Sequence, residues 1–224
     1  MMQSIVRECG AVSFPAFTGE RVYMHEFRME NGLPENLKRW QETVDQMLVG
    51  VDTDGPIYLM IDQKAVKAQV THRRPGMHVD GYWNPNGVWQ DQKPWNAISA
   101  GHRPAPSGPR HNARPGHGPR PTPRHVSCSG TVNGMWKFDP NDRPEAIILA
   151  SDICASRGLI GEFEGLTQIG GDVSHLDLSH VQEIILRENR VYQGNVSFIH
   201  ESLPVLHDCN RTLVRLNVPG HVVH

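Results

Sequence analysis

The chain has 224 residues, a formal net charge of −2 and 38% hydrophobic residues. This composition suits a single domain over residues 1–224 and gives no global reason to expect a membrane surface or nucleic acid as partner. No stretch approaches the roughly 20 apolar residues that a membrane-spanning helix needs. The four cysteines form no Cys-x-x-Cys pair, and the N-terminus lacks an apolar run suited to a signal peptide. We therefore expect a soluble cytoplasmic protein with reduced thiols.

The pattern of apolar residues predicts a mainly β protein with one early helix. Residues 21–29 alternate as a strand does, and residues 34–49 have apolar side chains at helical spacing. Further short strands are predicted at 56–62, 65–72, 76–83, 145–151, 158–165, 181–188, 190–200 and 211–218. The absence of a βα alternation favours an antiparallel jelly-roll or barrel.

A long insertion at about residues 91–135 separates the two groups of strands. Its central part, residues 101–125, holds five arginines, four histidines and seven of the 17 prolines, with no acidic residue. A segment of this composition has almost nothing to bury in a core. It is either a solvated extended loop or a basic segment that contacts a polyanion, a neighbouring subunit of a homo-oligomer or a larger assembly.

A candidate metal site begins at His78-Val79-Asp80. Residues two apart on a strand point to the same face, so His78 and Asp80 could hold one divalent ion together. The motif is weak when taken alone, because a second triplet occurs at His175-Leu176-Asp177. The simpler interpretation is a hydrogen-bonded pair beside a turn.

The C-terminal part adds residues that strengthen the first triplet. His200 closes a predicted strand, and Arg211 and Arg215 lie on one face of the next strand, together with Leu213 and Asn217. Two arginines on an otherwise apolar strand need an anionic partner, because a buried unpaired charge is costly. That partner is either a bound anion or a carboxylate such as Asp208 or Glu201.

Over residues 72–83 and 190–218 the chain resembles the Fe(II)- and 2-oxoglutarate-dependent oxygenases, which carry an early His-x-Asp, a late His and an Arg on the following strand. The resemblance implies a double-stranded β-helix of the jelly-roll or cupin-like kind. It also implies Fe(II) held by His78, Asp80 and His200, and 2-oxoglutarate whose far carboxylate binds Arg211. Arg215 would be a helper in cosubstrate binding or a substrate contact.

One position departs from that family pattern. Many members have Ser or Thr two residues after the Arg, where this chain has Leu213. One cosubstrate hydrogen bond must therefore come from elsewhere or be missing.

Other histidines compete for the metal. His207 is a rival of His200, but it lies four residues before Arg211, in a predicted turn. The triplet at 175–177 lies only 25 residues before His200 (200 minus 175), too few for the strands that normally intervene.

Three functions follow from these patterns. The first is an oxygenase that hydroxylates an unknown small-molecule or polyanionic substrate, with Arg74, Tyr82 and Trp83 as candidate substrate contacts. The second is a structural or assembly protein, for example a component of a viral particle, in which a jelly-roll carries a structural or vestigial metal site. The third is a cupin-like zinc enzyme or isomerase with His72 as an additional ligand.

Overall fold

The computed structural model describes residues 2–80, 145–165, 167–168 and 171–223, and the backbone alone of 129–132 and 135–138. Most of the predicted insertion, including 101–125, and the candidate substrate residues Tyr82 and Trp83 lie outside the described residues. From the insertion only β6 (Ser129–Val132) and β7 (Met135–Phe138) are described, as a two-stranded antiparallel sheet.

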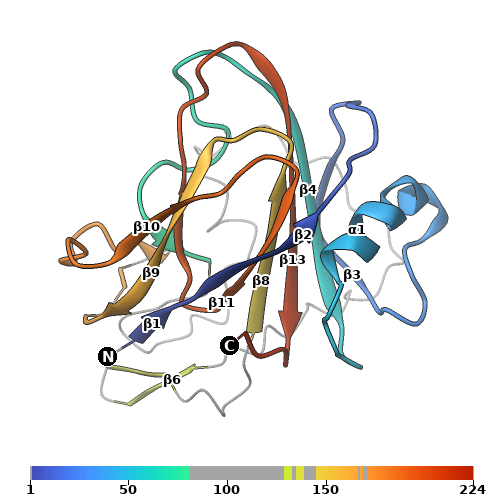
Figure 1. The fold of residues 1–224 in the computed structure, drawn as a ribbon. Helices are drawn as coiled ribbons and strands as arrows, with labels where there is room; N and C mark the ends of the chain where they lie inside the picture. The colour runs from blue at the N-terminus through green and yellow to red at the C-terminus, as the bar shows by residue number, and fades with distance from the viewer. Residues whose placement is uncertain are drawn as a thin grey trace, which may run out of the picture.

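Two larger antiparallel sheets make up the rest of the fold, which confirms the prediction of a mainly β protein (Figure 1). The large sheet has the strand order β2 (Val6–Ala11), β11 (Arg190–Asn195), β8 (Glu145–Ser151), β13 (Cys209–Pro219), β4 (Ile57–Val66) and β3 (Arg21–Phe27). The small sheet has the order β1 (Met2–Ser4), β9 (Ser156–Phe163), β12 (Ile199–Ser202) and β5 (His78–Val79), with β10 (Gln182–Ile185) also paired to β9.

Strands that follow one another in the chain are distributed between the two sheets. Strands β10 and β12 both pair with residues 157–159 of β9 and therefore lie on opposite edges of it. If β4, β5 and β8 to β13 are numbered one to eight, the large sheet contains the order 1-8-3-6 and the small sheet the order 2-7-4-5. Residues that are distant in sequence thereby meet between the sheets.

The outer face of the large sheet is apolar because alternate residues of its central strands point to one side. These residues are Ile57, Leu59 and Ile61 of β4, Ala146, Ile148 and Ala150 of β8, and Val214, Leu216 and Val218 of β13. They share one core cluster with Trp40, Val44 and Met47, which belong to the 3₁₀ segment η1 (Glu35–Trp40) and to helix α1 (Gln41–Met47). The early helix therefore covers this face. No described helix is long and apolar enough to cross a membrane.

The opposite face of the same strands carries polar side chains. Asp62, Glu145, Arg211, Arg215 and Asn217 are all buried on it. Arg211 of β13 reaches Ser156 on β9 and Ser202 on β12, so this face is turned toward the small sheet. The space between the sheets thus contains several buried charged groups.

Several element boundaries differ from the prediction. The strands predicted at 56–62 and 65–72 are one strand, β4, which ends at Val66, and the strand predicted at 190–200 is two. Phe198 N donates to Asn195 O in a turn between β11 and β12, so the chain changes sheets there. As a result His200 lies in the small sheet instead of extending β11.

A first prediction concerns the apolar cluster beneath α1. Trp40 has no exposed surface, and its indole N–H donates to Glu20 Oε2 at 2.8 Å. Trp40→Ala should lower the free energy of unfolding by about 3–5 kcal/mol, because it leaves a large cavity. Urea denaturation measures the change. Val49→Ala, at a side chain that is 66% exposed, is the control and should have little effect; equal losses in the two variants would contradict the assigned core.

Candidate metal centre

His78, Asp80 and His200 converge between the sheets. One potential ligand atom from each residue lies within 4.8 Å of the others. The convergence follows from the backbone, because His78 on β5 and His200 on β12 are directly paired across the small sheet and Asp80 follows β5. The two ring centroids are 4.8 Å apart.

Backbone hydrogen bonds fix the tautomers of both histidines. His78 Nδ1 donates to Gly76 O at 2.7 Å, and His200 Nδ1 donates to Phe198 O at 3.1 Å. A carbonyl only accepts, so each Nδ1 carries a proton and Nε2 is the ring nitrogen left to bind a metal. His200 Nε2 faces Asp80 Oδ2 at 3.3 Å. At this distance the two atoms can share either a proton or a metal cation.

The charges of the three groups suit a divalent cation. Burial, and next the charge of His200, lower the pKa of His78 to about 4, so its ring is neutral near pH 7. Burial opposes ionisation of Asp80, but Arg215 and His200 together hold the pKa of its carboxyl well below the usual range. Two imidazoles and one carboxylate are the donor set of non-haem Fe(II) oxygenases.

A second carboxylate supports the segment that carries His78. Glu201 Oε2 accepts a hydrogen bond from Gly76 N at 3.0 Å, and Arg157 Nε donates to Glu201 Oε1 at 2.6 Å. Both backbone polar groups of Gly76 are thus held, the N–H by Glu201 and the carbonyl by His78. Arg157 was not predicted from the sequence, and Glu201 was predicted only as a possible partner for the arginines of β13.

Arg215 completes the cluster. Its Nη1 donates to Asp80 Oδ2 at 2.5 Å. The two carboxylates considered as alternative partners for the β13 arginines are engaged elsewhere, Asp208 with Lys67 and Glu201 with Arg157. The carboxylate that pairs with this arginine is therefore a metal-ligand candidate itself.

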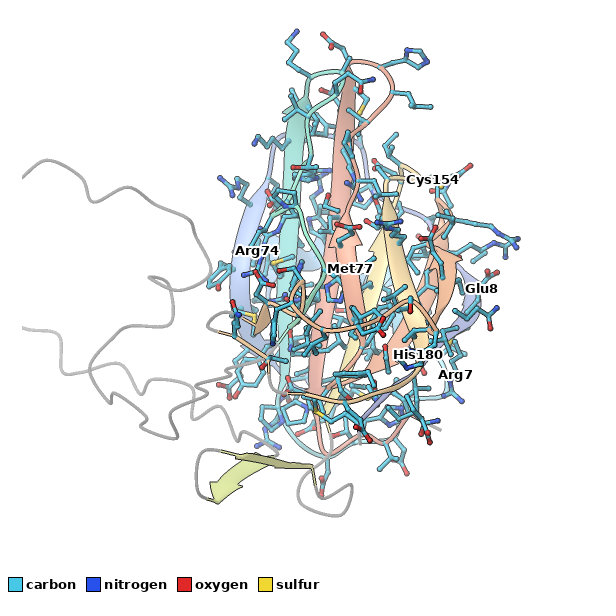
Figure 2. The ribbon with its side chains drawn as sticks, turned by 90° about the vertical axis from the view of Figure 1, so that its left-hand side faces the viewer. Arg7, Glu8, Arg74, Met77, Cys154 and His180 are labelled. Atoms are coloured by element: carbon cyan, nitrogen blue, oxygen red, sulfur yellow. The ribbon has the colours of Figure 1, made fainter. Side chains whose placement is uncertain are left out.

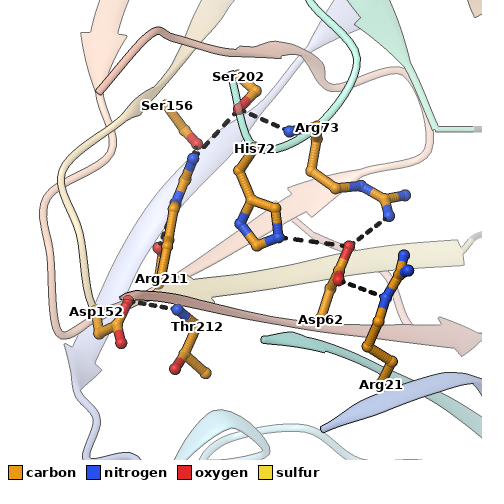
Figure 3. Close-up of polar contacts among 10 residues, drawn as sticks. Arg21, Asp62, His72, Arg73, Asp152, Ser156, Ser202, Arg211 and Thr212 are labelled. Atoms are coloured by element: carbon orange, nitrogen blue, oxygen red, sulfur yellow. Dashed lines mark hydrogen bonds and ion pairs between the residues drawn. The ribbon is translucent and has the colours of Figure 1, made fainter. Parts of the chain in front are cut away.

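Arg211 has a different environment, shown in Figure 3. Its side chain is fully buried, and its guanidinium group donates to three serine hydroxyls: Nε to Ser151 at 3.1 Å, Nη1 to Ser202 at 3.2 Å and Nη2 to Ser156 at 2.8 Å. Among the described residues it forms no ion pair. Burial lowers the pKa of Arg211, and the negative charge of Asp152 offsets part of this shift. The serines come from three strands, and no local sequence pattern marks them.

The rival histidines are not members of the metal cluster. His207 and the triplet residues His175 and Asp177 are exposed. His72, the additional ligand expected for a zinc enzyme, instead lies with its Nε2 3.5 Å from Asp62 Oδ2.

One of the three candidate substrate residues can be located. Arg74 is exposed on the segment that leads to β5 (Figure 2). Its charge contributes to the lowered pKa of His78, after burial and His200, so it lies near the cluster.

Comparison with known proteins gave one structural match. No family model and no curated protein matches the chain. Among solved structures, the crystal structure of EvdO2 from Micromonospora carbonacea var. aurantiaca complexed with 2-oxoglutarate matches with a TM-score of 0.35 and 12% identity. The match covers 75% of this chain and 54% of that chain, so the chain spans about half the length of EvdO2. At this TM-score the match carries no argument about fold or function.

A second prediction concerns Glu145, which is buried and accepts a hydrogen bond from Asn217 Nδ2 at 2.7 Å. Burial raises the pKa of Glu145 from 4.5 to about 7, and the hydrogen bond from Asn217 offsets part of this shift. Between these values the native state binds more protons than the unfolded state, so this group's contribution to stability is complete below pH 4.5 and is lost as the pH rises to 7.

Glu145→Gln, which stays neutral, should therefore be more stable than the wild type at pH 8, by on the order of 3 kcal/mol. The difference between variant and wild type should shrink as the pH is lowered to 5. Urea denaturation at both pH values measures it. The same difference at pH 5 and pH 8 would contradict the assigned pKa.

Proposed function

We propose that this chain is an Fe(II)- and 2-oxoglutarate-dependent oxygenase that hydroxylates a substrate C–H bond. One observation carries the proposal: two imidazole nitrogens and a carboxylate oxygen converge within 4.8 Å. These three residues would hold an iron ion and leave positions open for a chelating cosubstrate and O2.

The strand order supports a double-stranded β-helix as the scaffold. The orders 1-8-3-6 and 2-7-4-5 are those expected when eight strands roll up as two Greek keys. Such a fold brings an early strand pair and the last two strands together. This explains how His78 and His200 become neighbours although 122 residues separate them (200 minus 78).

The residues present fit a ferrous ion held by His78, Asp80 and His200. Bound iron and 2-oxoglutarate would supply O2 activation and the oxidative decarboxylation that drives hydroxylation. The chain's own part is to orient the ligands. The Gly76 and Phe198 carbonyls fix the two rings, and Arg215 holds the Asp80 carboxylate. Hydrogen bonds to metal-binding side chains set the direction and basicity of those ligands.

We assign Arg211 to the far carboxylate of 2-oxoglutarate. Serines accept from three of its five N–H groups, which leaves one N–H on Nη1 and one on Nη2. A carboxylate binds to such a pair of N–H groups in a bidentate manner. A bound anion would also compensate a buried charge that the described residues leave without an ion pair. Arg215, which the resemblance also linked to the cosubstrate, acts in this proposal through Asp80.

The substrate is proposed only as a class, a small molecule or a polyanion. Arg74 is the candidate contact among the described residues, with Tyr82 and Trp83 as predictions outside them. Assembly through residues 101–125 also stays a prediction. A cytoplasmic location agrees with Cys9, Cys154 and Cys209, which are free. Nothing in the described residues favours the viral or structural alternative.

The proposal is tested by succinate formation from 2-oxoglutarate in the presence of Fe(II) and O2. The wild type should form succinate only when the metal is present, and Asp80→Ala should reduce the rate to background because the site loses its anionic ligand. Asp177→Ala, in the exposed His-x-Asp triplet, is the matched control and should keep the wild-type rate. Circular dichroism verifies that both variants are folded. Wild-type turnover by Asp80→Ala would contradict the assignment.

A further inference from the structure

His72 is a fully buried histidine that the proposed mechanism does not yet use. Its side chain has no exposed surface, and Nδ1 has no hydrogen-bond partner in the part of the chain that the structure describes. Buried polar atoms without a partner are rare in folded proteins, because each costs about 1–3 kcal/mol. A ligand that supplies the partner would remove this cost.

The backbone around His72 is fixed. Gln69 N donates to Val205 O at 2.8 Å, and Val205 N donates to Val70 O at 3.1 Å. Arg73 N donates to Ser202 Oγ at 3.4 Å, the same hydroxyl that accepts from Arg211 Nη1. The segment that carries His72 and the guanidinium group of Arg211 are therefore tied to one serine.

The other side of the ring faces Asp62. His72 Nε2 lies 3.5 Å from Asp62 Oδ2, and the same carboxylate accepts hydrogen bonds from Arg21 Nε at 3.0 Å and Arg73 Nη1 at 2.9 Å. Figure 3 shows the ring on the side of Asp62 that faces Arg211. The strand register agrees, because Asp62 is paired with Leu213, two residues from Arg211 on the same face of β13.

We propose that His72 is a second donor for the carboxylate that Arg211 binds, with Nδ1 turned toward that carboxylate and Nε2 toward Asp62. This inference rests on the proposed function, since it names how the far carboxylate of 2-oxoglutarate is recognised.

Charged groups lie on both sides of the ring. Asp62 on β4 is faced by Arg21 of β3 and by Arg73, while Arg211 of β13 lies on the other side with Asp152 near it. A carboxylate bound to Arg211 would therefore lie on the side of the ring that is turned away from Asp62.

The experiment is calorimetric titration of the Mn(II)-loaded protein with 2-oxoglutarate at pH 7. His72→Gln should bind about 10-fold to 100-fold more weakly than the wild type, the equivalent of a lost charge-assisted hydrogen bond. His72→Asn serves as a second variant, and thermal unfolding checks the fold of both.

Two controls separate recognition from a merely structural role. His207→Gln, at an exposed histidine, should bind as the wild type does. Pyruvate, a 2-oxo acid without the far carboxylate, should bind equally to the wild type and to His72→Gln. Unchanged affinity for 2-oxoglutarate in His72→Gln, or equal weakening for pyruvate and 2-oxoglutarate, would overturn the role of His72. A wild type that binds neither acid would overturn the proposed function itself.

Discussion

The buried arginines of β13 are the constraint on which the rest of the site depends. A guanidinium group always carries its charge, and placing it between two sheets is tolerated only where partners compensate the lost hydration. Arg215 meets this requirement with Asp80, which brings a carboxylate beside His78 and His200. Arg211 meets it only with neutral serine hydroxyls among the described residues. Strand β13 therefore positions a candidate metal ligand through Arg215, and through Arg211 it carries a buried charge that a bound anion would compensate.

The two halves of the site are separated along β13 by a short distance. Arg211 and Arg215 are four residues apart, about 13 Å at roughly 3.3 Å per residue, and both point toward the small sheet. Leu213 lies between them, paired with Asp62. A ligand that chelates a metal at one end and presents a carboxylate at the other matches this arrangement of a cation site and a cationic side chain.

The sequence predicted the parts of the site that depend on local geometry. The period of a strand was enough to place His78 with Asp80, and Arg211 with Arg215, on common faces. His200 was named as a ligand through the family resemblance, but its position in the small sheet could not be predicted, because the turn at Asn195 that moves the chain from β11 to that sheet lies inside an uninterrupted strand-like pattern. The serines around Arg211, the support from Glu201 and the pairing of His72 with Asp62 depend on long-range register, which no local pattern encodes.

The most direct test of the metal centre is an anaerobic titration of the protein with Fe(II) and 2-oxoglutarate, followed by visible absorption. A chelate of iron and the 2-oxo acid at His78, Asp80 and His200 should produce a weak charge-transfer band. The band should be absent in His200→Ala. A protein that binds Fe(II) but gives no band with 2-oxoglutarate, or a band of equal strength in His200→Ala, would contradict the account.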